Sequence, residues 1–493
     1  MKPRVLLIKA APKADRPSLA PPLGIMLLAA ALRDQADVRL YDAGFDMYGA
    51  APPPVDKVRA MIAELRPIMV GISALTCERE CMIALAAAVK AVSPETVVVV
   101  GGPYPTAEPE AWRESPDIDW ALCGEGDEGL PKLLRAIVAG ELPRDIPGLV
   151  DRVGTGPHLK APAHPDLDAL PIPAYDLIDI HRYADTRFRN QTGLPAYTTY
   201  TSIMTSRGCP YKCGYCHDVL GKKFRGMSVE RVMQEVDAVV ALGVREVHFV
   251  DDIFNFDLPR AKAIFRAIAE RHPKLRLAFP NGLRADRLDQ EFATLAKAAG
   301  CWYAGIAVET ASARLQKAIQ KHLNLDKVSR AIGWLEDAGV RTRSFIMLGF
   351  PTETEDEMEA SIRYIIGTRT SEASFFNVVP YAGSELYLLA EDVKPGAASE
   401  STQAPFYSDE SFYSRATGVS LEKIRDRAIL RFYLSRGRFF KVLWRTPLKF
   451  WFSAGFLETL GFFGVRAAKG LMPWRGRGRS RRSGGAAAMR EAS

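Results

Sequence analysis

The sequence predicts an α/β protein in which a doubly wound parallel sheet precedes a partial (β/α)6 TIM-like barrel and a helical C-terminal region. Short apolar runs alternate with helical segments through the first 150 residues, and the alternation resumes with a longer period near residue 198. Proline-rich sequence separates the two series. The predicted parts are a first domain over 1–150, a linker over 151–195, a barrel over 196–390, a helical region over 391–474 and a disordered basic tail over 475–493.

The first domain is predicted to be Rossmann-like, because each short apolar run is followed by a stretch of helical character. The predicted strands are Val5–Ile8, Val38–Tyr41, Met69–Ile72, Val97–Val100 and Trp120–Leu122. Clear helical segments are Leu23–Leu32 and Met82–Val92. Sheets of this kind bind ligands beyond the carboxyl ends of their strands.

The barrel is predicted from six further β/α units. Its strands are predicted at Tyr200–Thr205, Glu246–Val250, Arg276–Phe279, Tyr303–Val308, Arg343–Leu348 and Ser374–Val379. The helices between them are predicted at Val229–Leu242, Pro259–Arg271, Gln290–Ala299, Leu325–Ala338 and Glu355–Ile366. Because active sites of such barrels lie at the carboxyl ends of the strands, we expect the functional residues in the loops that follow them.

The C-terminal region carries most of the positive charge. Residues 431–493 hold 14 Lys and Arg against two acidic residues, whereas the whole chain has a net charge of +7, so the rest of the chain is acidic. This distribution argues against a nucleic-acid partner. Between 431 and 474 cations alternate with large apolar residues, so this segment either covers the barrel or contacts an anionic membrane surface. Residues 475–493 are rich in Arg, Gly and Ser and are predicted to be disordered.

The cysteine content indicates a reducing, cytoplasmic environment. Seven cysteines are few and unevenly spread for 493 residues, which is not the pattern of a secreted disulfide framework. The apolar run behind Met1 is too short for a signal peptide. No uncharged apolar stretch reaches about 18 residues, so no membrane-spanning helix is predicted.

Three cysteines in one short loop point to a metal centre. Cys209, Cys213 and Cys216 follow the first predicted barrel strand with the spacing C-x3-C-x2-C. Thiolates suit zinc or an iron–sulfur cluster. A [4Fe–4S] cluster usually has four cysteine ligands, so three would leave one iron open to a substrate or cofactor. The alternatives are a zinc site completed by His217 and cysteines that are simply buried.

This loop resembles the cluster loop of the radical S-adenosylmethionine (SAM) enzymes, and short elements at the later strand ends match that family in order. The resemblance implies a cluster whose open iron chelates SAM, and reductive cleavage of SAM to methionine and a 5′-deoxyadenosyl radical. It also implies SAM contacts from residues at successive strand ends, namely Tyr215, Asp251, Asp252, Arg284, Glu309 and Gly349. The Asp251-Asp252 pair replaces the commoner Gly-Gly-Glu of the family.

The first domain resembles the cobalamin-binding domain that precedes the barrel in one subclass of this family. The matching segments are Ser73-Ala74-Leu75 and Gly101-Gly102-Pro103, and the resemblance implies cobalamin contacts from Gly24, Ser73, Leu75, Gly101, Gly102 and Glu125. The first 157 residues contain no histidine, so a bound cobalamin would lack a lower imidazole ligand from this domain. A domain that binds another nucleotide, or no ligand, is the alternative.

The resemblance implies a cobalamin-dependent methyltransferase that acts on an unactivated carbon of a natural-product or lipid-like small molecule. A non-methylating oxidative cyclase or rearrangement enzyme with the same cofactors is one alternative. A redox- or SAM-sensing binding protein is another. The implied partners are a small-molecule substrate and a flavodoxin- or ferredoxin-like electron donor. The expected location is cytoplasmic, with membrane association if residues 431–474 contact lipid.

Overall fold

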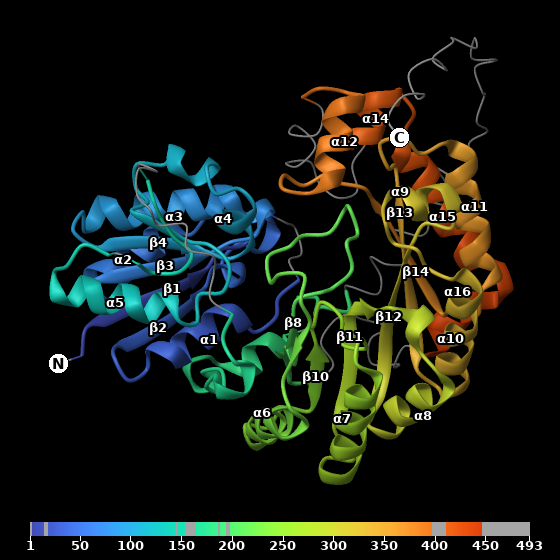
Figure 1. Ribbon diagram of the computed structural model, residues 1–493, viewed down its shortest axis with the longest axis horizontal. Coiled ribbons are helices and arrows are strands. Elements are labelled where there is room, and N and C mark those ends of the chain that lie inside the picture. The colour runs from blue at the N-terminus through green and yellow to red at the C-terminus, as the bar shows by residue number, and fades with distance from the viewer. Residues whose placement is uncertain are drawn as a thin grey trace. The chain divides into compact units, whose positions relative to one another are not determined.

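The computed structural model (Figure 1) describes residues 2–13, 18–143, 145–152, 164–185, 188–193, 198–396 and 411–445. The predicted tail over 475–493 and the later part of the predicted helical region, 446–474, lie outside these residues. Part of the predicted linker, 153–163, does so as well.

The N-terminal sheet has the strand order β2-β1-β3-β4-β5-β6. Its strands are β1 (Arg4–Lys9), β2 (Asp37–Asp42), β3 (Met69–Ser73), β4 (Val97–Gly101), β5 (Trp120–Leu122) and β6 (Leu149–Asp151). The first five are parallel, as predicted, and β6 adds an antiparallel edge that the sequence did not predict. The chain order reverses between β1 and β3, and ligands of doubly wound sheets bind at such a reversal.

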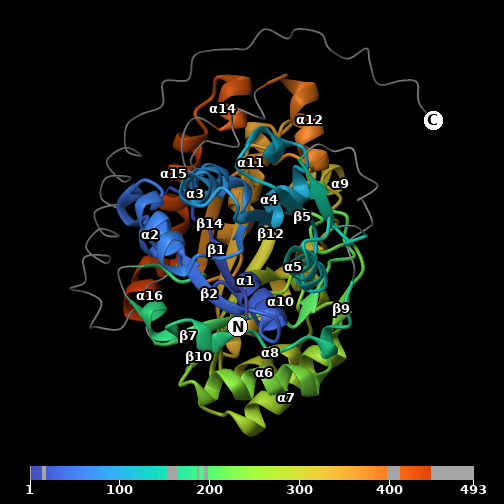
Figure 2. The same cartoon turned by 90° about the vertical axis from the view of Figure 1, so that its left-hand side faces the viewer.

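Helices cover both faces of this sheet, as the doubly wound prediction requires. They are α1 (Leu23–Leu32), α2 (Val55–Leu65), α3 (Arg79–Val92), α4 (Pro103–Ala107) and α5 (Gly129–Ala139). Figure 2 shows α2 and α3 on one side of the sheet and α5 on the other. The alternate residues of β1 therefore enter two separate apolar cores, Leu6 and Ile8 with α2 and α3, and Val5 and Leu7 with α1 and α5.

The second sheet consists of six parallel strands in the order β14-β13-β12-β11-β10-β7. They are β7 (Tyr200–Ile203), β10 (Glu246–Phe249), β11 (Arg276–Leu283), β12 (Cys301–Glu309), β13 (Arg341–Leu348) and β14 (Glu372–Asn377). Because β7 and β14 each have a single neighbour, the sheet is a partial barrel, which confirms the prediction. Residues 1–446 form one compact unit.

Side-chain caps start the helices that surround this sheet. The helices are α6 (Val229–Ala241), α7 (Leu258–Arg271), α8 (Gln290–Ala298), α9 (Ala313–Ala318), α10 (Leu325–Asp337) and α11 (Glu355–Gly367). Ser228, Asp257, Asp289, Ser312, Asn324 and Thr354 each accept a hydrogen bond from a backbone N–H in the first turn.

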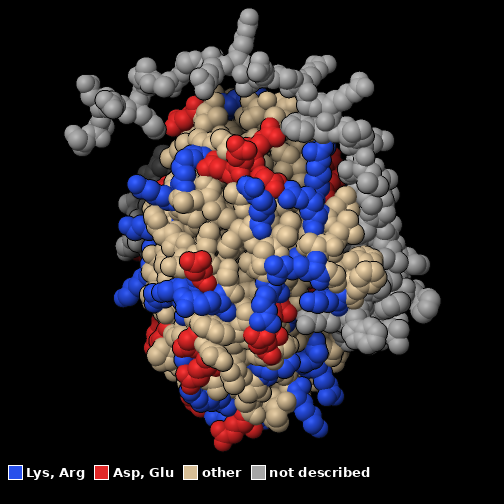
Figure 3. Space-filling view, turned by 90° about the vertical axis from the view of Figure 1, so that its right-hand side faces the viewer, with Lys and Arg blue, Asp and Glu red and all other residues tan. Residues whose placement is uncertain are grey.

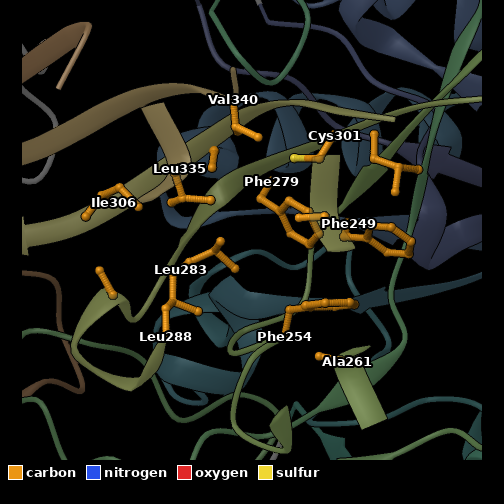
Figure 4. Packing of buried hydrophobic residues seen from close by; sticks show 14 of the residues in the cluster. Phe249, Phe254, Ala261, Phe279, Leu283, Leu288, Cys301, Ile306, Leu335 and Val340 are labelled. Atoms are coloured by element: carbon orange, nitrogen blue, oxygen red, sulfur yellow. The ribbon is translucent and has the colours of Figure 1, made fainter. Parts of the chain in front are cut away.

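The apolar faces of these helices pack on the sheet. Figure 4 shows the rings of Phe249, Phe254 and Phe279 together in this core, with centroids 4.8–5.3 Å apart.

The described part of the C-terminal region is helical and packs on the barrel. It contains α12 (Glu385–Val393), α14 (Phe412–Thr417), α15 (Leu421–Leu434) and α16 (Arg438–Arg445). Leu421 and Phe432 are fully buried in the barrel core. Arg438 is buried and donates to the carbonyls of Ile366 in the last turn of α11 and of Thr368 and Thr370 beyond it. Residues 421–438 therefore complete the barrel.

On the side of the molecule that lies to the right in Figure 1, Lys and Arg are interspersed with Asp and Glu (Figure 3). One such pair joins Arg431 of α15 to Glu359 of α11, with nitrogen–oxygen distances of 2.6 and 2.8 Å. None of the described helices combines the length and the apolar character that crossing a bilayer requires.

Candidate functional site

The cysteine loop is enclosed by a short antiparallel hairpin at the carboxyl end of β7. Its strands are β8 (Ser206–Arg207) and β9 (Arg225–Gly226). The backbone N–H of Cys209 donates to the carbonyl of Gly221 at 3.1 Å. Gly208 has φ +80°, and a Cβ there would lie 2.3 Å from the carbonyl oxygen of Lys223. Only glycine therefore lets the chain enter the cysteine loop in this way.

The loops at later strand ends hold the cysteine loop in place. The N–H of Gly214 donates to the carbonyl of Ile319, and the carbonyl of Gly214 accepts from the N–H of Leu386. Cys209 and Cys213 are half-buried and Cys216 is exposed. The Cys213 Sγ lies 3.9 Å from the carbonyl oxygen of Gln320. All three predicted ligands thus lie on one fixed loop at the expected end of the barrel.

No three His, Cys, Asp or Glu side chains among the described residues are gathered closely enough to hold a single metal ion. The zinc alternative stays open beside the cluster. Cluster ligation by the three cysteines stays a prediction.

Two of the predicted SAM residues meet, and a lysine joins them. The Tyr215 hydroxyl donates to Glu309 Oε1 at 3.3 Å, and the Lys321 Nζ lies 2.9 Å from that hydroxyl and 3.4 Å from Glu309 Oε1. Burial, together with Glu309, raises the pKa of Tyr215. Arg284 contacts the backbone beside this lysine, because its Nη2 donates to the carbonyl of Lys321 at 2.9 Å. Its guanidinium also lies 3.8 Å from the ring centroid of Tyr211.

Lys321 lies between two of the predicted SAM residues, and the sequence analysis did not name it. Its side chain is only 9% exposed. Gln320 and His322 on either side have φ of +53° and +52°, and Glu309 has φ +67°. Left-handed backbone at non-glycine residues is strained and concentrates at functional sites. Neither Gln nor His signals such a conformation in a sequence, so no pattern could have singled out this lysine.

The two predicted aspartates occupy different surroundings. Asp251 is fully buried, and its Oδ1 accepts from the hydroxyls of Thr205 and Ser206 at 2.7 and 2.5 Å. It thus fixes the chain that enters the cysteine loop. Asp252 lines the cavity described below, and burial raises its pKa although His217 opposes this. Its position is compatible with the predicted contact to the SAM amine, whereas Asp251 faces the protein.

Gly349 has φ +90° and packs against the C-terminal helices. A Cβ there would lie 2.7 Å from Leu421 Cδ2 and 2.9 Å from Tyr413 Cβ. Packing in the protein therefore already requires this glycine. The next residue, Phe350, contacts Tyr215 with ring centroids 6.4 Å apart. The expected approach of this turn to adenine stays a prediction.

A cavity of about 570 Å³ lies between the N-terminal sheet and the barrel. The N-terminal domain contributes all six residues that the sequence analysis assigned to cobalamin, Gly24, Ser73, Leu75, Gly101, Gly102 and Glu125. The barrel and its loops contribute Ser202, Met204, His217, Asp252 and Asn281. The cavity lies beyond the carboxyl ends of β1 and β3, where the strand order reverses.

The residues around this cavity fit a large planar cofactor. Gly24 has nothing within 4 Å of its Cβ position, and Leu75 is 42% exposed. Gly102 serves the fold as well, because a Cβ there would lie 2.9 Å from Ser73 Oγ. Lys9 ends β1, and its ammonium is paired with Glu78.

Glu125 has partners within the protein. Its carboxylate accepts from Arg207, Arg225 and His164. Burial alone would raise the pKa of Glu125, but the hydrogen bonds from the two arginines hold it below its usual value. The carboxylate is therefore engaged, and a contact of Glu125 with cobalamin stays a prediction.

Comparisons with known proteins identify the two halves of this site. A family model of the radical SAM superfamily matches residues 203–365, and a model of the B12 binding domain matches residues 12–134. The chain is 30% identical over 374 residues to an uncharacterized methyltransferase of Pyrococcus horikoshii, PH0819, which covers 74% of this chain and 78% of the relative.

Two further relatives cover most of the chain. It is 27% identical over 429 residues to cytidylyl-2-hydroxyethylphosphonate methyltransferase of Streptomyces wedmorensis, covering 78% and 79% of the two proteins. The solved structure of the radical SAM methyltransferase TsrM from Kitasatospora setae, with cobalamin and a [4Fe–4S] cluster bound, matches 80% of this chain and 78% of that one. The TM-score is 0.64 at 21% identity, which shows a shared fold.

Proposed function

Because the chain belongs to the cobalamin-dependent radical SAM enzymes, whose cofactors are a [4Fe–4S] cluster, SAM and cobalamin, we propose that it is a methyltransferase acting on an unactivated carbon of a small molecule. The observation that carries the proposal is the shared cavity. Residues from the cobalamin-binding half and residues from the barrel line one space, so both halves face the same substrate.

The protein's own residues bind and orient the cofactors. When bound, the cofactors supply the 5′-deoxyadenosyl radical and the methyl group. Cys209, Cys213 and Cys216 would hold the cluster, with Tyr215, Glu309, Arg284 and Asp252 around SAM. The small residues at the ends of β3 and β4 would admit the corrin, and the first 157 residues offer no imidazole to it.

The substrate is inferred to be of low polarity. Leu7, Leu27, Met204, Val219 and Leu220 contribute apolar surface to the cavity. Its uncharged polar side chains include Gln191, Ser202 and Asn281, and the Asn281 amide already donates to the carbonyl of Val250 at 2.7 Å. Charged side chains, among them Lys9, Asp42, Glu78 and Asp252, also line the cavity. A natural-product or lipid-like molecule with a few polar groups fits this lining.

Product mass tests the proposal. Protein reconstituted anaerobically with iron, sulfide and hydroxocobalamin is incubated with SAM, dithionite and candidate low-polarity molecules. A gain of one methylene in the product supports methyl transfer. A product that loses hydrogen or is rearranged without that gain indicates the cyclase alternative. A cluster-loaded protein that binds SAM without cleaving it indicates the sensing alternative.

We also infer the surroundings in which the enzyme works. The family's use of a reduced cluster calls for a flavodoxin- or ferredoxin-like electron donor and a cytoplasmic location. Peripheral membrane contact rests on Leu434 and Phe440, which are 75% and 71% exposed beside Arg436 and Lys441. Binding to anionic vesicles that salt weakens would support this contact. Absence of binding at low salt would contradict it.

A further inference from the structure

Four buried charges connect the cobalamin-binding half of the molecule to the cysteine loop. We name this set, Glu125, Asp127, Arg207 and Arg225, the interdomain ion-pair network. The Arg207 Nη1 lies 2.6 Å from Glu125 Oε2 and 2.6 Å from Asp127 Oδ2, and its Nη2 lies 3.1 Å from Asp127 Oδ1. Arg225 bonds to both oxygens of Glu125 and to the carbonyl of Leu220.

The carboxylates and the arginines of the network come from different domains. Glu125 and Asp127 lie in the loop between β5 and α5, at the carboxyl edge of the cobalamin-binding sheet. Arg207 and Arg225 face each other across the β8–β9 hairpin. That hairpin encloses the cysteine loop, and Arg207 precedes Cys209 by two residues. The network therefore joins the carboxyl edge of the N-terminal sheet to the hairpin that encloses the cysteine loop.

The network is dry and geometrically specific. The side chains of Glu125, Arg207, Asp127 and Arg225 are 2%, 5%, 7% and 15% exposed. Two carboxylates balance two guanidiniums, and the Arg207–Asp127 pair is bidentate, which fixes both distance and angle. A buried pair of this kind adds little net stability, but removal of one partner leaves an uncompensated charge. The network therefore acts mainly on the placement of the cysteine loop relative to the N-terminal sheet.

We propose that the interdomain ion-pair network is a positioning device that sets the distance and orientation of the cysteine loop relative to the cobalamin cavity. Glu125, Asp127 and Arg207 line that cavity, and the network acts through the loops that carry the predicted ligands. The proposal rests on the proposed function, since it assumes a cluster at the cysteine loop and cobalamin in the cavity.

The test measures the magnetic coupling between the reduced cluster and Co(II) cobalamin by electron paramagnetic resonance, because this coupling depends on distance and angle. Asp127→Asn keeps the side-chain shape and removes the carboxylate that pairs with Arg207. We expect iron and cobalamin contents at the wild-type level, with the coupling broadened or lost. A variant that keeps both cofactors and the wild-type coupling would overturn the proposal.

Asp176→Asn is the matched control. It removes the pair between Asp176 and Arg33, the residue that follows α1, whose nitrogen–oxygen distance is 2.6 Å. These side chains are 56% and 51% exposed, so the pair is screened by water and should leave the coupling unchanged.

A second measurement uses the wild-type apoprotein, so it remains informative if the variant fails to fold or the cofactors do not bind. The backbone amides of residues 124–129 and 206–209 should be protected from hydrogen exchange to the same extent, because breaking the network would open both segments together. Unrelated exchange rates in the two segments would contradict the proposal. Wild-type protein that binds neither cluster nor cobalamin would instead contradict the proposed function alone.

Discussion

Gly24 and Gly102 both line the cavity, but a side chain would meet different surroundings at each. At Gly24 the Cβ position is open, whereas at Gly102 it lies 2.9 Å from Ser73 Oγ and the backbone has φ +90°. Replacement of Gly102 by leucine would therefore damage the sheet as well as the cavity. Gly24 is the position at which cobalamin access can be blocked without disturbing the fold.

We predict that Gly24→Leu lowers cobalamin loading severalfold while the protein stays folded. The leucine would project into open space beside α1, and loss of a helical glycine favours stability by up to about 1 kcal/mol. Absorbance of bound cobalamin and thermal unfolding measure the two effects. Gly367→Leu, at another open position at the end of α11, should load normally. Full loading of Gly24→Leu would remove the cavity from consideration as the cobalamin site.

The cysteine loop yields a second prediction at the residue scale. Replacing Cys209, Cys213 or Cys216 with alanine should reduce iron to background and abolish 5′-deoxyadenosine formation, since each thiolate would ligate one iron. Iron analysis and chromatography of the nucleoside products measure both. Cys77→Ala, in the short 3-10 helix Thr76–Glu78 of the other domain, should retain iron. Normal iron in all three loop variants would be incompatible with the cluster.

Lys321 yields a third prediction at the residue scale. Lys321→Met keeps the aliphatic stem but removes the ammonium between Tyr215 and Glu309. Without this ammonium the two predicted SAM contacts, Tyr215 and Glu309, lose the partner that holds them together, so SAM affinity should fall roughly tenfold, with iron content unchanged. Equilibrium binding of SAM to cluster-loaded protein measures this. Lys317→Met, on an exposed position of α9, is the control. Equal affinities in the two variants would exclude a role for Lys321 at the SAM site.

At the scale of elements, the hydrophobic pattern predicted most strands within a few residues. Val97–Val100 and Trp120–Leu122 carry continuous apolar runs, which a strand buried on both faces requires, and these became β4 and β5. The edge strand β6 and the two-residue strands β8 and β9 were not predicted. A segment of two or three residues is too short to show a repeating hydrophobic pattern. Helix α9 is six residues long and escaped for the same reason.

The turn after β13 gives an element-scale prediction about pH. Glu353 is buried and accepts from the backbone N–H groups of Gly349 and Phe350, and burial raises its pKa to about 8. Between about pH 4.5 and pH 8 the folded protein holds a proton that the unfolded chain releases. This group therefore makes stability fall as pH rises through that window, by up to about 1.4 kcal/mol per pH unit.

Glu353→Gln should flatten this dependence, because the amide stays neutral at every pH in the window. Urea unfolding at pH 5, 6.5 and 8 measures the free energy of unfolding of both proteins. The wild-type protein should lose more stability over this range than the variant. Parallel curves for the two proteins would show that Glu353 does not titrate in the folded state.

At the scale of the whole molecule, the sequence predicted the two ligand-binding edges but not the contacts between them. Motif order places Cys209 and Glu309 at one end of the barrel and Ser73 and Gly102 at one edge of the N-terminal sheet. It cannot show which loops meet across the gap. Glu125 illustrates this, since a residue predicted to contact cobalamin is bonded to Arg207, 82 positions away in sequence.

The fate of the methyl group of SAM tests the central claim, a cobalamin-dependent radical SAM methyltransferase, without knowledge of the substrate. Protein reconstituted anaerobically with a cluster and hydroxocobalamin is given a strong reductant and SAM labelled in its methyl group. We predict label on the protein-bound cobalamin, together with 5′-deoxyadenosine that disappears in Cys213→Ala. Protein that binds both cofactors and cleaves SAM but leaves the label entirely in SAM and methionine would contradict methyl transfer.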